Sequence, residues 1–197
     1  LIVYSSDNGS FRSDRVGVLR GKKGSNYQGG LRVPGIFCWP AKIKSGIEIE
    51  EPAGLVDLMA TICDFVGYEM PEEIHLDGSS LKPLLIGAPQ NFKRPQPFFW
   101  HFAESKQIVG IRDGNYSLLA YPDYEFSKGE KFNEAWIPTI KEGGYRDFEL
   151  YDLDNDPMQK DDLAIQRPEL LLSLKNKLLK INASVMAEGS DWHLDSQ

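Results

Sequence analysis

The sequence has no run of apolar residues long enough to cross a bilayer, since a membrane-spanning helix needs about 20 of them. It has no internal repeat and no low-complexity segment, so nothing indicates a repeat architecture or a disordered linker. Its basic and aromatic residues do not form the pattern typical of nucleic-acid-binding proteins, and its formal net charge is −7. A membrane span and a nucleic-acid partner are therefore not expected.

Cysteine is also scarce, with Cys38 in an expected strand and Cys63 in an expected helix. We expect free thiols rather than a disulfide, and Cys38 to be a buried thiol. No signal peptide stands at the start of the sequence, but the chain opens inside an expected strand and should continue upstream. With 197 residues, of which 41% are hydrophobic, the chain can bury one sizeable core or two small ones.

The first residues that suggest chemistry follow an apolar run at the start of the chain. Residues 1–4 predict a strand buried on both faces, as in a parallel sheet, and Asp7 and Asn8 follow its carboxyl end. Ligands of open α/β sheets gather beyond such strand ends, where carboxylate and carboxamide oxygens can bind a metal. The pair Asn8-Gly9 is also a strong turn signal, so a simple tight turn remains the alternative.

A basic, glycine-rich segment comes next, over residues 19–35. Residues 1–34 hold six Lys or Arg against two Asp, in a chain that is acidic as a whole. Glycine lets a ligand approach the backbone closely, and lysine supplies positive charge. This segment is either a solvated basic face or a site for an oxyanion.

Together these two segments resemble the second half of the formylglycine-dependent sulfatases, which belong to the alkaline phosphatase superfamily. Ser6-Asp7-Asn8-Gly9 is followed by Gly21-Lys22-Lys23-Gly24-Ser25-Asn26-Tyr27-Gln28-Gly29-Gly30-Leu31-Arg32-Val33-Pro34, where the family commonly has Glu in place of Gln28. Further stretches resemble the family in the same order: Asp57–Ile62, Leu76–Leu85, Phe98–Phe102, Gly110–Tyr116 and Glu149–Leu153. The order and spacing over most of the chain make the resemblance specific.

The resemblance implies roles for individual residues. Asp7 and Asn8 would be two calcium ligands, and Lys23 would contact the sulfate or the bridging oxygen of the ester. The family's nucleophile is a formylglycine made from a Cys/Ser-x-Pro-x-Arg motif, which Cys38-Trp39-Pro40-Ala41-Lys42 imitates with Lys in place of Arg. We therefore expect the formylglycine and the other calcium ligands to lie in the N-terminal half of the same protein, and this chain alone to be inactive.

The family also implies a substrate and a location. The substrate would be a small-molecule or carbohydrate sulfate ester, and the protein would be periplasmic or secreted. His101 could reach a substrate sugar, although a packed, hydrogen-bonded histidine is the more common case. Two alternatives stay open: a phosphoesterase or phosphonate hydrolase of the same superfamily, and a non-catalytic module in which Asp7-Asn8-Gly9 is only a turn.

The expected fold is α/β: the C-terminal part of an alkaline-phosphatase-like sulfatase domain over residues 1–90, then a small α+β subdomain over 91–197. In the first part we expect a buried strand at 33–39, a helix at 53–66 ended by Gly67, and a loop at 68–97. In the second part we expect an antiparallel sheet from strands at 97–102, 107–112, 116–121 and 148–153, covered on one face by a helix at 168–187. Residues 152–156 imitate a calcium loop, but Pro157 and Leu163 replace its glycine and glutamate, which predicts a capped turn.

Overall fold

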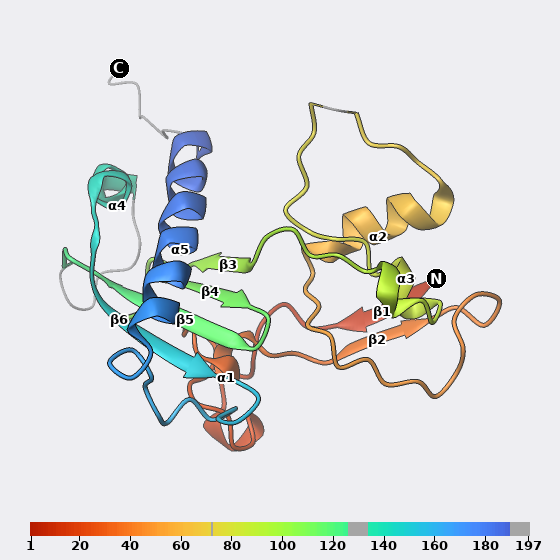
Figure 1. The fold of residues 1–197 in the computed structure, drawn as a ribbon, viewed down its shortest axis with the longest axis horizontal. Coiled ribbons are helices and arrows are strands. Elements are labelled where there is room, and N and C mark those ends of the chain that lie inside the picture. Colours follow the sequence, from red (N-terminus) through yellow and green to blue (C-terminus); the bar gives the residue numbers. More distant parts are fainter. Residues whose placement is uncertain (72, 126–133, 190–197) are drawn as a thin grey trace. The chain divides into compact units, whose positions relative to one another are not determined.

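The computed structural model describes residues 1–71, 73–125 and 134–189 (Figure 1). The chain divides into two compact units. The first consists of Leu1–Asn8 and Val33–Pro97, and the second of Gly9–Arg32 and Phe98–Gln197. The glycine-rich segment thus belongs with the C-terminal residues. The domain boundary after residue 90 concerns the longer protein and stays a prediction.

The first unit contains a two-stranded antiparallel ribbon, in which β1 (Ile2–Ser5) pairs with β2 (Gly35–Cys38). The prediction of strands buried on both faces in a parallel sheet is therefore wrong for the ribbon. Ile2 is 69% exposed and Tyr4 61%, because no described element packs on the side of the ribbon that carries them. Cys38, at the end of β2, is likewise exposed rather than buried, and both cysteines are free as expected.

One helix organises the rest of this unit. The helix α2 (Asp57–Val66) ends at Gly67, whose φ of 70° is the left-handed conformation that favours glycine. The predicted end is confirmed, but the helix begins at Asp57 rather than at residue 53, because the Gly54 amide donates to the Asp57 carboxylate at 2.8 Å. The segment 68–97 contains two short helical turns, α3 (Lys82–Leu85) and η2 (Pro89–Asn91). The helix α3 helps to build a small core from Ile43, Phe65, Leu81, Leu84 and Leu85.

A buried ion pair joins distant parts of the first unit. The Asp57 carboxylate is fully buried and accepts two hydrogen bonds from the Arg94 guanidinium, at 3.0 and 2.8 Å. It also accepts the Ser79 amide at 2.8 Å. Every oxygen of this buried charge is therefore satisfied, and the carboxylate ties the start of α2 to two later loop segments.

The second unit is built on a four-stranded antiparallel sheet in the order β3-β4-β5-β6. Its strands are β3 (Phe98–His101), β4 (Val109–Asp113), β5 (Tyr116–Pro122) and β6 (Tyr145–Asp152). The four predicted strands are confirmed, and β6 begins three residues earlier than expected. A tight turn joins β4 and β5, with Asp113 paired to Tyr116 and a φ of 56° at Gly114.

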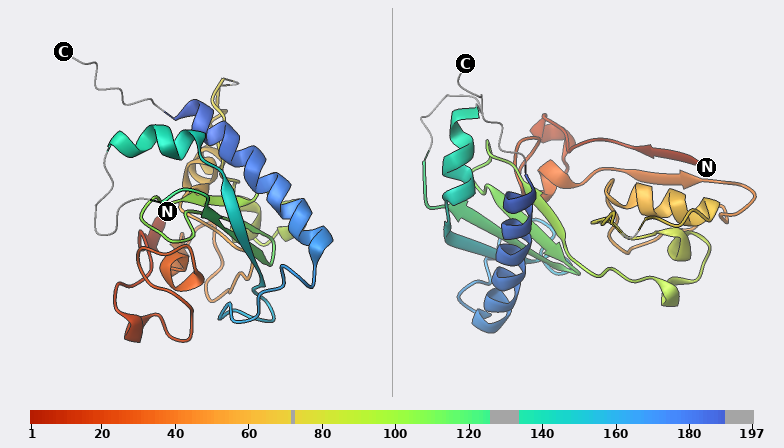
Figure 2. Two further views of the ribbon diagram at one scale, coloured as in Figure 1. Left: turned by 90° about the vertical axis from the view of Figure 1, so that its left-hand side faces the viewer. Right: turned by 90° about the horizontal axis from the view of Figure 1, so that it is seen from above.

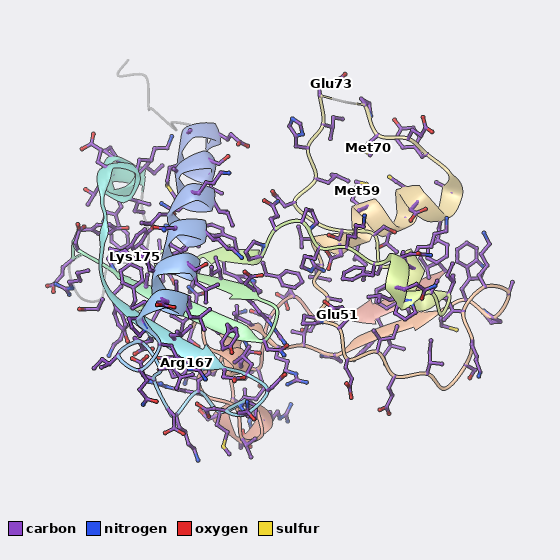
Figure 3. The ribbon with its side chains drawn as sticks, in the orientation of Figure 1. Glu51, Met59, Met70, Glu73, Arg167 and Lys175 are labelled. Carbon is purple, nitrogen blue, oxygen red and sulfur yellow. The ribbon has the colours of Figure 1, made fainter. Side chains whose placement is uncertain are left out.

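The helix α5 (Pro168–Glu188) covers one face of this sheet, as predicted (Figure 2). Its Leu174 and Leu178 are buried against Ile111, Leu118 and Leu150. The Lys175 ammonium, on the same helix, lies 4.5 Å from the Phe148 ring centroid (Figure 3). A shorter helix, α4 (Ile137–Glu142), follows the turn η3 (Glu134–Trp136), and neither was predicted. Within the described ranges, no helix combines the length and apolar character needed to cross a membrane.

The glycine-rich segment packs on the other face of the sheet. Successive strand residues point to opposite faces, so Leu118 and Leu150 face α5 while their neighbours Leu119 and Tyr151 face away from it. On that second face they form a cluster with Tyr27 and Leu153. The N-terminal part of this unit, Gly9–Arg32, contains two short turns, η1 (Ser13–Arg15) and α1 (Gln28–Leu31). The sheet therefore lies between α5 and the loop that carries the candidate lysine.

Candidate functional site

The loop presents its two lysines at a tight turn. The Lys23 amide donates to the Ser10 carbonyl at 2.9 Å, and the Ser25 amide and hydroxyl donate to the Lys22 carbonyl at 3.1 and 3.0 Å. Gly24 has a φ of 89°, which a residue with a side chain adopts only with strain. Both lysine side chains are exposed, and neither ammonium group has a hydrogen bond or ion pair to another described residue. Both charges are therefore available to an anion.

Behind this turn the loop is buried. Asn26, Tyr27 and the next three residues are all in the interior. The side-chain amide of Asn26 donates to the backbone carbonyl of Gln107 at 2.6 Å. A Cβ on Gly29 or Gly30 would lie 2.4 or 2.1 Å from a backbone oxygen, so only glycine permits this close packing of the chain. The exposed lysines thus stand on a rigid base.

A polar network fixes this base to the sheet. The Tyr27 hydroxyl donates to the Glu149 carboxylate at 2.7 Å and also accepts a hydrogen bond from Gln107. Burial raises the pKa of Tyr27, and the neighbouring carboxylate raises it further, so the phenol keeps its proton. The Arg20 guanidinium lies 4.0 Å from the Tyr27 ring centroid and donates to the Tyr151 hydroxyl at 2.9 Å. Arg20 and Tyr27, on either side of Lys23, are therefore both anchored.

The predicted metal ligands belong to the first unit, and Lys23 belongs to the second. Asp7 is exposed and Asn8 half-buried, and the Asn8 amide donates to the Asp7 carboxylate at 2.7 Å. Their carboxylate and carboxamide oxygens are of the kind that calcium prefers, although the amide would have to turn to present its oxygen. Two such residues supply fewer oxygens than the six to eight that calcium takes. Among the described residues, no group of three or more His, Cys, Asp or Glu could hold a metal.

His101 is the last residue of β3, and the next residue, Phe102, lies near the lysine turn. A Cβ on Gly24 would lie 3.8 Å from the ring of Phe102, the next residue after His101. The His101 side chain is half-buried, and its Nε2 is covered and has no hydrogen-bond partner among the residues that the structure describes. Burial lowers the pKa of His101, so the imidazole is neutral at pH 7. A covered, neutral ring favours the packed histidine, and a role in substrate binding stays a prediction.

The imitation calcium loop is a capped turn, as predicted. The Asp152 carboxylate accepts a hydrogen bond from the Asn155 side chain at 2.9 Å and others from the backbone amides of Asp154 and Asn155 at 3.1 and 3.4 Å. The side-chain bond chiefly, and the backbone bonds with it, lower the pKa of Asp152. The sequence reasoning missed Gln159, which follows this turn and is fully buried under the lysine loop. No local signal would have found it, because a glutamine among charged residues is usually at the surface.

Comparison with known proteins identifies the class. Residues 22–133 match the family described as "N-sulphoglucosamine sulphohydrolase, C-terminal". This match begins at the lysine turn and covers more than half of the chain. The chain therefore belongs to the sulfatase family and corresponds to the C-terminal part of such an enzyme. The resemblance seen in the sequence is confirmed.

Curated sulfatases and solved structures agree with this assignment. Human arylsulfatase A is 30% identical over 191 residues, which cover 91% of this chain and 37% of that protein. A sulfatase structure from Pseudoalteromonas sp. superposes with a TM-score of 0.68 at 22% identity, over 98% of this chain and 38% of that one. A protein solved with its substrate D-glucosamine-2-N,6-O-disulfate gives a TM-score of 0.60 at 22% identity, over 97% of this chain and 35% of that one.

These matches define the fold and its limits. The structural neighbours confirm the predicted fold class, an α/β sulfatase fold with a small antiparallel sheet packed against a helix. The chain spans 17% to 41% of the length of the curated sulfatases that it resembles. The matches therefore define the family and the fold of this chain, and the activity of the whole enzyme is proposed below.

Proposed function

We propose that Lys23 binds the sulfate group of a sulfate ester in a full-length sulfatase, and that Asp7 and Asn8 are ligands of a calcium ion in that protein. The observation that supports the proposal most strongly is that the Lys23 ammonium group, on an anchored loop, is exposed and unpaired among the described residues. The loop beneath this group is buried and hydrogen-bonded. An exposed cation that has no internal partner and stands on an anchored loop is suited to an external anion.

The reaction would use this cation in its transition state. Cleavage of a sulfate ester builds negative charge on the transferred group and on the leaving oxygen, and an ammonium held there lowers the barrier. The pair Asp7 and Asn8 would hold calcium, which when bound supplies a second positive charge at the same group. The formylglycine nucleophile would come from another segment of the protein, since these 197 residues contain no Cys/Ser-x-Pro-x-Arg motif.

The proposed substrate is a carbohydrate or small-molecule sulfate ester. Two of the related proteins support this class: one is an arylsulfatase, and the other was solved with a sulfated glucosamine as its substrate. A periplasmic or secreted location, proposed from the family resemblance alone, would give the enzyme access to such substrates.

Calcium binding tests the divided metal site. We expect calorimetry on the isolated chain to detect no calcium site of micromolar or tighter affinity, because Asp7 and Asn8 supply too few oxygens to compete with water. In the full-length protein, calcium should bind, and Asp7→Ala should remove that binding.

The control is Glu73→Gln, which changes an exposed carboxylate elsewhere in the first unit. It should leave the calcium affinity of the full-length protein unchanged. A micromolar site in the isolated chain that Asp7→Ala abolishes would show that the metal site is complete here, and the proposal of a divided site would be wrong.

A further inference from the structure

We propose that Gln159 is a positioning residue for the lysine loop and acts on catalysis only through Lys23. This inference rests on the proposed function, because it assumes that Lys23 binds the sulfate. Gln159 touches neither lysine. It holds the two ends of the loop segment that carries them.

The backbone of Gln159 is held in an unusual conformation. Its φ is 53°, the only positive value for a non-glycine residue in the described part of the chain, and the residue is fully buried. Left-handed backbone is unfavourable for a residue with a side chain, so surrounding contacts must stabilise it. One such contact comes from Arg20, whose guanidinium donates to the Gln159 carbonyl at 2.8 Å.

The side chain of Gln159 makes the second contact. Its Oε1 accepts a hydrogen bond from the backbone amide of Gln28 at 2.8 Å. Its Nε2 donates to the Ser117 hydroxyl at 3.4 Å. Gln28 opens the helical turn α1, where the first amides have no partner within the helix. Gln159 therefore satisfies a buried amide that would otherwise be unpaired, and links it to β5 of the sheet.

The two contacts lie on either side of Lys23 in the sequence. Arg20 precedes it by three residues and Gln28 follows it by five, so one residue fixes both ends of the turn. The Lys23 side chain has no anchor of its own among the described residues, so its position follows from that of the loop backbone. A shift of about 1 Å in a catalytic group can cost about 100-fold in rate.

The test uses the full-length sulfatase with a chromogenic sulfate ester. Gln159→Gly removes the side-chain acceptor while permitting the positive φ. We expect it to lower kcat by about 10- to 100-fold and to change KM much less, as for loss of a residue that orients a catalytic group. Gln159→Glu keeps an oxygen acceptor for the Gln28 backbone amide and should retain most of the wild-type kcat. Lys160→Gly places glycine at the next, exposed position and should leave kcat unchanged.

Coupling to Lys23 separates positioning from a general loss of stability. The double variant Lys23→Ala with Gln159→Gly should be no slower than Lys23→Ala alone, because Gln159 has no other route to the reaction. Multiplicative effects on kcat would overturn the inference. The inference would also be overturned if Gln159→Gly kept full activity while Lys23→Ala slowed the enzyme. If Lys23→Ala itself has no effect, the proposed function fails, and this inference fails with it.

Loss of folding is controlled by a second variant. Should Gln159→Gly not fold, Gln159→Met keeps the length of the side chain without the hydrogen-bond acceptor, and it is judged by the same comparison of kcat. In either variant, hydrogen exchange at the Gln28 amide should accelerate relative to wild type. Unchanged protection of that amide would contradict the proposed contact.

Discussion

Replacing Lys23 with alanine in the full-length sulfatase should lower kcat for sulfate ester hydrolysis by about 100- to 1,000-fold, or about 3–4 kcal/mol. The ammonium would be a fixed charge on oxygens that become more negative in the transition state, and alanine offers nothing in its place. The buried base of the loop, with Asn26 and Tyr27 hydrogen-bonded to the sheet, should keep its structure in the variant. Steady-state kinetics with an aryl sulfate measure the effect.

The matched control is Lys22→Ala. Lys22 is also exposed and carries the same charge, but the resemblance to the family assigns the sulfate contact to the lysine immediately before Gly24, which is Lys23. Loss of the Lys22 side chain should therefore weaken substrate binding slightly and leave kcat within a few-fold of wild type. Equal effects of the two substitutions would mean that the loop acts through its total charge, and that the role assigned to Lys23 is wrong.

The largest expected effect on stability comes from Asp57→Ala. Asp57→Ala removes the buried carboxylate to which the Arg94 guanidinium, only 12% exposed, donates two hydrogen bonds, and it removes the acceptor of the Ser79 amide. We expect the free energy of unfolding to fall by about 3–5 kcal/mol, as for other broken buried ion pairs. Urea unfolding, with the slope of the transition checked for constancy, measures the change.

Asp64→Ala serves as the comparison for this prediction. Asp64 pairs with Lys82 at 2.7 Å, but the two side chains are 40% and 32% exposed. Water screens such a pair, so its loss should cost about 1 kcal/mol or less. A similar cost for both variants would show that burial of Asp57 does not decide its contribution.

The second unit could be predicted from the sequence because its strands are short apolar segments and its helix α5 has an apolar stripe. Strand residues such as Leu118 and Leu119 alternate between two apolar environments, and leucines recur at helical spacing along α5. The first unit was less predictable. An apolar run such as Ile2–Ser5 suggests burial, but burial depends on the elements that pack against it, and here Ile2 and Tyr4 are exposed.

The candidate site also has parts that the sequence predicts and parts that it does not. Local motifs predict Lys23, Asp7 and Asn8 because a short segment carries each of them. The contacts that hold the lysine loop join residues far apart in the sequence, as between Arg20 and Gln159. Neither residue is apolar or periodic, and the left-handed backbone of Gln159 has no signature in its residue type. Such contacts depend on how the sheet and the loop pack together.

The most direct test is a crystal structure of the full-length sulfatase with a bound sulfate ester or inorganic sulfate. The account predicts the Lys23 Nζ within hydrogen-bond distance of a sulfate oxygen, about 2.7–3.2 Å, and oxygens of Asp7 and Asn8 coordinating a calcium ion beside it. A sulfate bound in the catalytic centre while Lys23 extends into solvent, or a calcium ion held without Asp7 and Asn8, would contradict it.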